Sequence, residues 1–206
     1  MSREDWYRNN VWNEDIAEAY FTKLQRARSK DQYLRIQANY LTEKYPEIAL
    51  ELLDKFFELN EPFDLAQAYC DKAAALHNLG NAEEAIESYK QALKFEKNQG
   101  TAQTQAYLSL PMLFVEHDTK QHFEFGIELL NEYVGRLMFP IDYFRWHTAM
   151  AVFKYGLGDC TEASKQAGLA LDAAQVKKSG FRYHQQLGLV GKEYKKTIKV
   201  LRAIYA

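Results

Sequence analysis

The stretch AQAYCDKAAALHNLGNAEEAIESYKQALKFE, residues 66–96, decides the fold. Apolar residues recur at helical spacing on both sides of Gly80, which suits a turn whose backbone takes a positive φ. Ala73 and Ala85 would let the two helices approach closely, and Ala92 would do the same toward a following helix. The stretch therefore predicts an antiparallel pair of helices packed through small residues.

The same pattern returns in residues 151–171 at one constant offset. The matching residues are Ala73 and Ala151, Leu79 and Leu157, Gly80 and Gly158, Asn81 and Asp159, Glu84 and Glu162, Ala85 and Ala163, Ala92 and Ala170, and Leu93 and Leu171. Ala49 and Gly126 take the place of Ala85 in two further segments, so the pattern recurs about every 40 residues, a period typical of helical solenoids. Because Pro and Gly are few and hairpin signals are missing, the chain is predicted to be all-α.

This pattern resembles the tetratricopeptide repeat family. Residues 66–96 match through Tyr69, Ala73, Leu76, Gly80, Ala85, Tyr89 and Ala92, and residues 146–172 match through Ala151, Gly158, Ala163 and Ala170. Residues 33–59 and 106–134 match weakly, because Gln37 stands where a small residue is usual and Pro111 is atypical. The resemblance covers roughly residues 30–175 and implies tandem antiparallel helix pairs in a right-handed superhelix with a concave, partner-binding groove. It implies no catalysis.

The resemblance also implies that the first helix of each pair lines the groove. The residues that it places there are Gln67, Cys70, Ala74, His77 and Asn78 in the earlier pair, and Arg145, Thr148, Val152 and Tyr155 in the later pair. The alternative is that they are ordinary surface or packing residues. Within Tyr143–His147 we expect Phe144 or Trp146 in the core and Arg145 exposed.

Three parts are expected along the chain: an N-terminal aromatic segment and capping helix in residues 1–29, about four helix pairs in 30–175, and a loop with a basic capping helix in 176–206. Trp6 and Trp12 either fold back on the first helices or form an exposed binding strip. The expected helix starts are an Asn13 cap, Pro46 in a first turn, and capping boxes of Asn81 with Glu84, Asp118 with Gln121 and Asp159 with Glu162. Pro111 should kink or split its helix near Leu110.

The formal net charge is -2, but the C-terminal segment is strongly basic. A final helix from about Val190 is predicted to carry an apolar stripe of Val190, Tyr194, Ile198, Leu201 and Tyr205. Its opposite side carries Lys192, Lys195, Lys196, Lys199 and Arg202. Such a helix can cap the last repeat, or it can bind nucleic acid or another anionic surface.

Motifs that carry chemistry are missing from the sequence. The five His residues form no metal-ligand pattern, and no phosphate-binding loop or nucleophile motif is present. Cys70 and Cys160 are expected to be buried or half-buried free thiols, which favours a reducing cytoplasm. We see neither a signal peptide nor a membrane span, and we expect no metal and no cofactor.

The sequence therefore predicts a cytoplasmic protein-interaction scaffold or adaptor that binds a peptide or protein partner. A neutralising or regulatory partner of another protein, a nucleic-acid binder and an enzyme on a helical scaffold stay open as alternatives. The oligomeric state also stays open.

Overall fold

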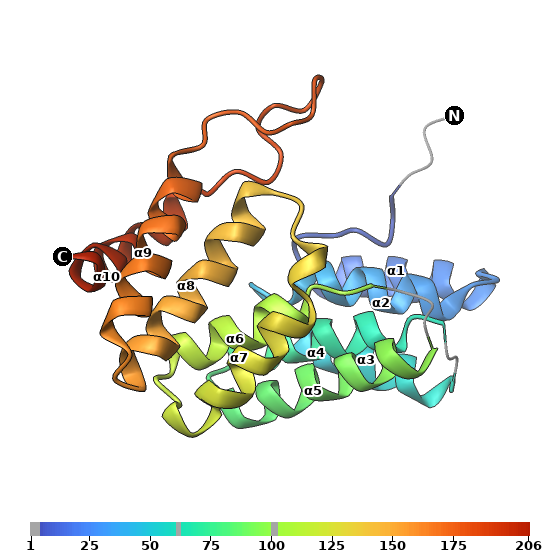
Figure 1. Cartoon of the computed structure of the whole chain (residues 1–206). Coiled ribbons are helices and arrows are strands. Elements are labelled where there is room, and N and C mark those ends of the chain that lie inside the picture. Colours follow the sequence, from blue (N-terminus) through green and yellow to red (C-terminus); the bar gives the residue numbers. More distant parts are fainter. Residues whose placement is uncertain (1–4, 61–62, 100–102) are drawn as a thin grey trace. The chain divides into compact units, whose positions relative to one another are not determined.

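A computed structural model describes residues 5–60, 63–99 and 103–206. The described residues form helices and no strand, which confirms the all-α prediction. In chain order the α-helices are α1 Glu14–Arg26, α2 Lys30–Leu41, α3 Pro46–Glu58, α4 Leu65–Asn78, α5 Ala82–Gln99, α6 Ala106–Glu116, α7 Phe123–Glu132, α8 Pro140–Gly156, α9 Cys160–Gln175 and α10 Lys195–Tyr205 (Figure 1). Three short 3₁₀ helices are η1 Lys120–His122, η2 Val134–Arg136 and η3 Lys192–Tyr194.

The chain divides into two compact units, residues 1–106 (the N-terminal unit) and residues 107–206 (the C-terminal unit). Each unit is described by itself, because the position of one relative to the other is not determined. The predicted array over residues 30–175 spans both units and stays a prediction. Of the helices in the described ranges, none combines the length and apolar character that a membrane crossing requires.

The helix starts agree with the sequence at three of the predicted positions. The Asn13 side chain accepts a hydrogen bond from the Ile16 amide at 2.9 Å, and Pro46 stands in the first turn of α3. The Asp159 carboxylate accepts one from the Glu162 amide at 3.2 Å. Each such cap satisfies an amide that the first turn leaves unpaired.

The predicted capping box of Asp118 with Gln121 is wrong. Asp118 has a φ of 46°, a left-handed conformation that short polar residues tolerate, and it belongs to the end of α6. The Thr119 amide closes that end by donating to the Phe114 carbonyl at 3.2 Å. Helix α7 begins only at Phe123, after η1.

Pro111 does not split its helix at Leu110, because α6 runs from Ala106 to Glu116 with the proline inside. The proline removes the hydrogen bond that its amide would give to the carbonyl four residues earlier. Apolar side chains on both sides of it, including Leu110 and Phe114, are fully buried. Their packing offsets the missing hydrogen bond.

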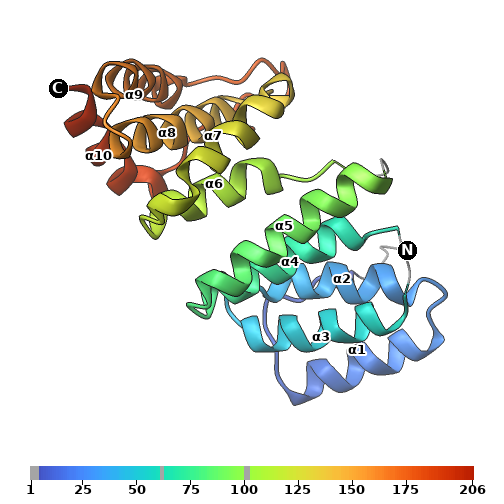
Figure 2. The same ribbon diagram turned by 60° about the horizontal axis from the view of Figure 1, so that its bottom comes forward.

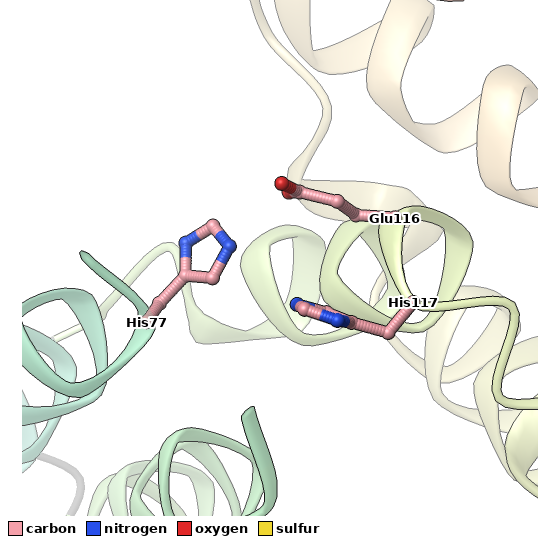
Figure 3. Close-up of side chains that lie close together, drawn as sticks. All are labelled: His77, Glu116 and His117. Carbon is pink, nitrogen blue, oxygen red and sulfur yellow. The ribbon is translucent and has the colours of Figure 1, made fainter. Parts of the chain in front are cut away.

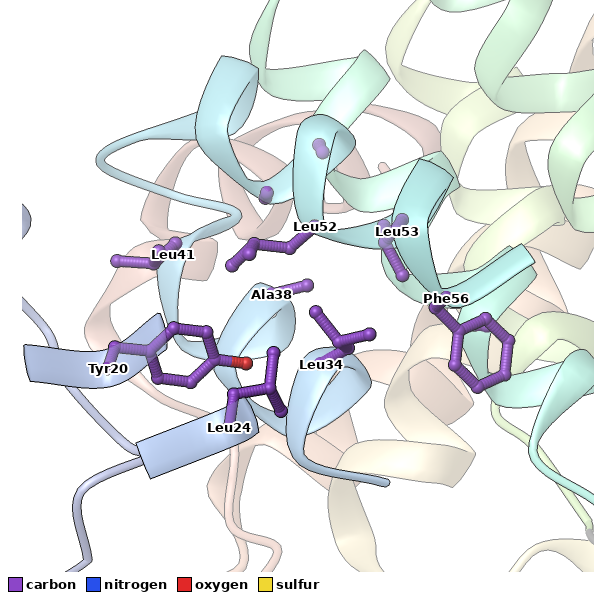
Figure 4. Packing of buried hydrophobic residues seen from close by; sticks show 11 residues of the cluster. Tyr20, Leu24, Leu34, Ala38, Leu41, Leu52, Leu53 and Phe56 are labelled. Carbon is purple, nitrogen blue, oxygen red and sulfur yellow. The ribbon is translucent and has the colours of Figure 1, made fainter. Parts of the chain in front are cut away.

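The core of the N-terminal unit lies among α1, α2 and α3, as Figure 4 shows. Its buried side chains include Tyr20, Leu24, Leu34, Ala38, Leu41, Leu52, Leu53 and Phe56. Burying one such large side chain contributes roughly 1.5–3 kcal/mol. Helix α4 packs against α3 and pairs with α5, so the helices of this unit lie in successive layers (Figure 2).

The N-terminal aromatic segment folds back onto this core. Trp6 packs against Tyr20 and Tyr33, and Trp12 packs against Tyr20. Gln37, which stands where the repeat pattern expects a small residue, is fully buried. Its amide nitrogen donates to the Asn9 carbonyl at 2.9 Å, and its oxygen accepts from the Asn9 amide at 3.0 Å. Gln37 therefore departs from the repeat pattern and binds the N-terminal segment through Asn9.

The hairpins α4–α5 and α8–α9 repeat each other in detail. Gly80 and Gly158 have φ values of 83° and 88°, which confirms the predicted turns. After the turns, the amide of residue 81 donates to the Leu76 carbonyl and the amide of residue 159 donates to the Lys154 carbonyl, both at 2.9 Å. The small residues predicted at the contacts, Ala73, Ala85, Ala92, Ala151, Ala163 and Ala170, are all fully buried.

Helix α10 packs on α9 and α8 in the C-terminal unit. Leu201 is fully buried against Phe144, Ala167 and Ala170, and Val190, Tyr194 and Ile198 pack beside them. The helix begins at Lys195 after η3, later than the predicted start near Val190. Tyr205 is more than half exposed, although its ring lies against Gly168, and Ile204 packs on the cluster in addition to the predicted stripe.

Candidate partner-binding surfaces

A polar network links α2 to α4 in the N-terminal unit and includes one of the predicted groove residues, Gln67. The Asp71 carboxylate accepts hydrogen bonds from the Asn39 amide at 2.8 Å and from the Gln67 amide at 3.1 Å. Arg35 pairs with Asp71 at 3.4 Å and with Asp64 at 3.1 Å. The amide of Gln67 is therefore engaged inside the unit.

The electrostatics of Asp71 show why the network is structural. The carboxyl group is 2% exposed, and burial raises its pKa above the ordinary value. The Arg35 guanidinium and the Gln67 and Asn39 amides oppose that rise by favouring the charged form. A buried carboxylate with this set of donors joins the two helices, and removing it would leave Arg35 without its most deeply buried partner.

The other predicted groove residues of α4 have different environments. Cys70 is buried, and burial raises the pKa of its thiol to about 12, so the thiol stays protonated and is not a nucleophile. His77 is half-buried, and Asn78 is exposed and donates to the Thr42 carbonyl at 2.9 Å. The second cysteine, Cys160, is exposed at the start of α9, contrary to the expectation of a buried or half-buried thiol.

Figure 3 draws His77 of α4 together with Glu116 and His117 at the end of α6. His77 belongs to the N-terminal unit, whereas Glu116 and His117 belong to the C-terminal unit. Since the two units are not placed relative to each other, these three side chains define no site. The expectation that the chain holds no metal stays a prediction.

In α8, two of the predicted groove residues lie deeper than expected. Thr148 is fully buried, and its hydroxyl has no hydrogen-bond partner among the described residues. The prediction that Arg145 is exposed is wrong, because it is half-buried and donates to the Ser109 hydroxyl at 3.0 Å. Phe144 and Trp146 are both buried, as expected for that segment. Of the groove residues predicted in α8, Tyr155 is the one that is strongly exposed, at 56%.

An apolar cleft that the sequence did not predict lies in the C-terminal unit. It has a volume of about 430 Å³ and lies between the first half of α8, the second half of α9 and the segment that follows α9. Its lining residues are Met138, Pro140, Tyr143, His147, Leu169, Ala173, Val176, Lys178 and Gly180. Four of the lining side chains are large, apolar and at least 40% exposed, namely Met138, Tyr143, Leu169 and Val176. A cluster of this kind marks a binding surface more often than a bare stretch of protein surface.

The repeat register explains why the cleft is open. At the offset that relates the two hairpins, His147 stands at the position of Tyr69, and Ala173 stands at the position of Phe95. In α4–α5 the Tyr69 and Phe95 rings occupy these positions and stack with centroids 5.3 Å apart. In α8–α9 a smaller ring and a methyl group replace them, and the volume stays empty of side chains.

His147, which lines the cleft from α8, belongs to a hydrogen-bonded chain of polar groups that continues through Gln166 and Glu162 of α9. The Gln166 amide donates to Glu162 at 2.6 Å, so its oxygen faces Nδ1 of His147, also at 2.6 Å. Burial lowers the pKa of His147, and the contact with Gln166 only partly opposes this. The imidazole is therefore neutral near neutral pH, with the proton on Nδ1 and with Nε2 as the acceptor.

The loop after α9, which borders the cleft, is irregular, as predicted. Several contacts anchor it. Phe181 stacks on Phe139 with ring centroids 5.4 Å apart. The Ile141 amide donates to the Gly188 carbonyl at 2.8 Å, and the Ser179 amide donates to the Gln185 carbonyl at 2.8 Å. The contacts of Phe181 and Gly188 fix the loop to the start of α8, and the bond between Ser179 and Gln185 lies within the loop.

Exposed basic side chains lie on the loop that borders the cleft and on α10. Residues 176–191 contain Lys177, Lys178 and Arg182, all exposed, and no Asp or Glu. The predicted basic surface is also exposed, at Lys192, Lys195, Lys196, Lys199 and Arg202. The side of α10 that faces away from α9 is therefore cationic.

Comparison with known proteins gives no further assignment, since no protein-family model and no curated protein matches the chain. The candidate site therefore depends on the geometry described above.

Proposed function

We propose that the chain is a protein-interaction module, and that its C-terminal unit binds a segment of another protein in the cleft between α8 and α9. The observation that supports this most is the group of exposed apolar side chains around a cleft of about 430 Å³. Four large apolar groups left in contact with water cost free energy unless a partner covers them. Volumes of this order are typical of ligand sites.

A peptide segment fits the cleft better than a small compact ligand. The cleft lies along two helices and is open to solvent, so its long floor suits a helix or an extended strand. Apolar anchors would occupy the space above Ala173, while Leu169 and Tyr143 would contact their sides. A neutralising or regulatory partner protein would use the same mode of binding.

We also propose that the helix pairs α2–α3, α4–α5, α6–α7 and α8–α9 stack as a tetratricopeptide-like right-handed superhelix. The shared turn conformation at Gly80 and Gly158 and the buried alanines of both hairpins support this. Free thiols at Cys70 and Cys160 support a cytoplasmic location. A crystal structure of the whole chain would test the stacking.

A second candidate function is binding of nucleic acid or another anionic surface by α10. Its four exposed basic side chains favour it, together with Lys192 in the preceding η3. Such binding would weaken steeply with salt, because each neutralised phosphate releases counterions. Titration of duplex DNA, RNA and anionic vesicles at two salt concentrations would test this candidate, with Lys195, Lys196 and Lys199 changed to Glu as the variant.

The proposed peptide binding can be tested by selecting from a random peptide library on the folded chain. We expect enriched peptides, and we expect Leu169→Gln to weaken each of them about tenfold or more, because Leu169 is an exposed anchor of the cleft. Glutamine is the residue at the equivalent position of α5, Gln91, so the exchange suits the fold. Enrichment of no peptide, or full binding by Leu169→Gln, would contradict the proposal.

A further inference from the structure

The charges around the cleft indicate what kind of segment binds there. We infer that the occupant is an acidic segment, in which a bulky apolar side chain is flanked by carboxylates. This inference depends on the proposed function, because it names the partner of the same cleft. The inference follows from the charged groups beside the cleft and from the acidic groups that already form hydrogen bonds within the unit.

Among the described lining residues, the one Lys, Arg, Asp or Glu side chain is that of Lys178. Lys178 lines the cleft, and Lys177 and Arg182 are exposed on the same loop. None of the described residues that line the cleft is Asp or Glu. The three basic residues of the loop outnumber the one exposed acid beside the lining of α9, Asp172, so an occupant with carboxylates near its anchor would meet net attraction.

Two acidic residues near the cleft, Asp142 and Glu162, are engaged in internal hydrogen bonds, whereas Asp172, next to the lining residue Ala173, is exposed. The Asp142 carboxylate is 5% exposed and accepts hydrogen bonds from the Met138 and Phe139 amides at 3.2 and 3.0 Å, where it caps α8. Glu162 accepts from Gln166 and lies about two helical turns before Leu169, the first lining residue of α9. Neither group offsets the positive charge of the loop.

Apolar contact and charge would have separate roles in recognition. The apolar lining supplies most of the binding free energy, because the exposed faces of Met138, Tyr143 and Leu169 lose their water. Lys178 lines the cleft, and Lys177 and Arg182 are exposed on the same loop, where ion pairs contribute modestly but select the partner and speed association. His147 adds a third element, since its Nε2 can accept a hydrogen bond from an N–H group of the anchor.

A nucleic acid fits this cleft poorly. Its backbone would need several cations along one track, but Lys178 is the single basic side chain among the described lining residues. The cleft therefore favours a protein segment over a nucleic acid.

The experiment is to sequence the peptides enriched on the full chain and to measure affinities of synthetic versions. We expect Asp and Glu on either side of a large apolar residue. The double variant Lys177→Glu with Lys178→Glu should bind an acidic peptide about tenfold or more weakly, and a peptide with its acids changed to Lys should recover the loss. The matched control is Lys195→Glu with Lys196→Glu, which makes the same charge change on α10 and should bind normally.

The possible failures are distinguishable. Enrichment of neutral or basic peptides that still lose binding in Leu169→Gln would overturn the acidic partner but keep the proposed function. Equal losses in the two charge-reversal variants would show general electrostatics and also overturn the inference. Displacement of the acidic peptide by single-stranded RNA at equal concentration would assign the surface to nucleic acid instead. Failure to enrich any peptide would contradict the proposed function itself. Melting temperatures show whether each exposed-lysine variant is folded.

Discussion

Hairpins α4–α5 and α8–α9 share the positions that fix their packing and differ in the positions beside them. Both have a glycine of positive φ in the turn and fully buried alanines at the contacts. In α4–α5 the flank is filled by the stacked rings of Tyr69 and Phe95. In α8–α9 the same flank carries His147 and Ala173 and is open.

The difference teaches that the repeat sets the scaffold and that departures from it make the binding surface. The two ends of the chain follow the same rule. In the N-terminal unit, Gln37 departs from the small-residue pattern and holds Asn9. In the C-terminal unit, Leu201 of α10 covers the face of α9 that has no following repeat. The predictions below test this division between shared scaffold and local departure.

The largest effect on stability is expected from the polar network that joins α2 to α4 of the hairpin α4–α5. Asp71→Ala removes a buried carboxylate that binds Arg35, Asn39 and Gln67, and should lower the free energy of unfolding by roughly 3–5 kcal/mol. Urea unfolding measures this loss. The control Glu18→Ala, on an exposed position of α1, should change stability by less than about 0.5 kcal/mol. An equally small effect of Asp71→Ala would mean that the network is not structural.

The C-terminal cap comes next. Leu201→Ala removes a fully buried side chain between α10 and the hairpin α8–α9 and should cost about 2–5 kcal/mol. Changing Lys195, Lys196 and Lys199 to Glu should alter stability only slightly, because all three are exposed. Deletion of residues 189–206 should cause aggregation or a large loss of stability. A stable, soluble deletion variant would contradict the capping role.

The shared register predicts a smaller and symmetrical effect. Ala85→Leu and Ala163→Leu each force extra methylene groups into a helix contact and should cost about 1–3 kcal/mol. Thermal unfolding followed by circular dichroism compares the two variants directly. If one variant melts like the unaltered chain, the two hairpins do not share the register.

The smallest effect on stability is the pH dependence expected from His147, which its counterpart Tyr69 would not cause. Burial lowers the pKa of His147 below its ordinary 6.5, so below that pH the unfolded chain takes up the proton before the folded chain does. His147 should therefore reduce stability as the pH falls through this window. Unfolding free energies of the unaltered chain and of His147→Tyr, measured between pH 7.5 and about 5, should fall more steeply with falling pH in the unaltered chain. Parallel pH profiles would mean that the folded-state pKa is not lowered.

The fold class was predictable because it follows from local signals. Helical periodicity, Gly80, Gly158 and the small residues at fixed spacing each act within one hairpin. The wrong predictions concern helix boundaries that depend on packing between residues far apart in the sequence. Asp118 closes α6 instead of starting α7, and α6 continues through Pro111 because buried neighbours hold it. A cap motif or a proline in the sequence does not reveal such contacts.

The candidate site was largely missed. The family resemblance suggested Cys70, Thr148 and Arg145 because it implies that the first helix of each pair lines the groove. In the structure the first two are buried and the third is half-buried. One signal was available, since the offset that aligns the alanines also places His147 at Tyr69 and Ala173 at Phe95. The anchoring of the loop by Phe139 and Gly188 depends on long-range contacts and left no such signal.

The central claim is that the binding site exists because α8–α9 has no rings at the positions of Tyr69 and Phe95. Filling the cleft with such rings tests this claim most directly. The double variant His147→Tyr with Ala173→Phe copies the stack of Tyr69 and Phe95 into α8–α9. Isothermal titration with the tightest selected peptide measures the result, and circular dichroism verifies the fold. We predict a folded protein with at least a roughly tenfold weaker affinity, because the rings occupy the volume of the anchor. A folded double variant that binds the peptide with unchanged affinity would contradict the account.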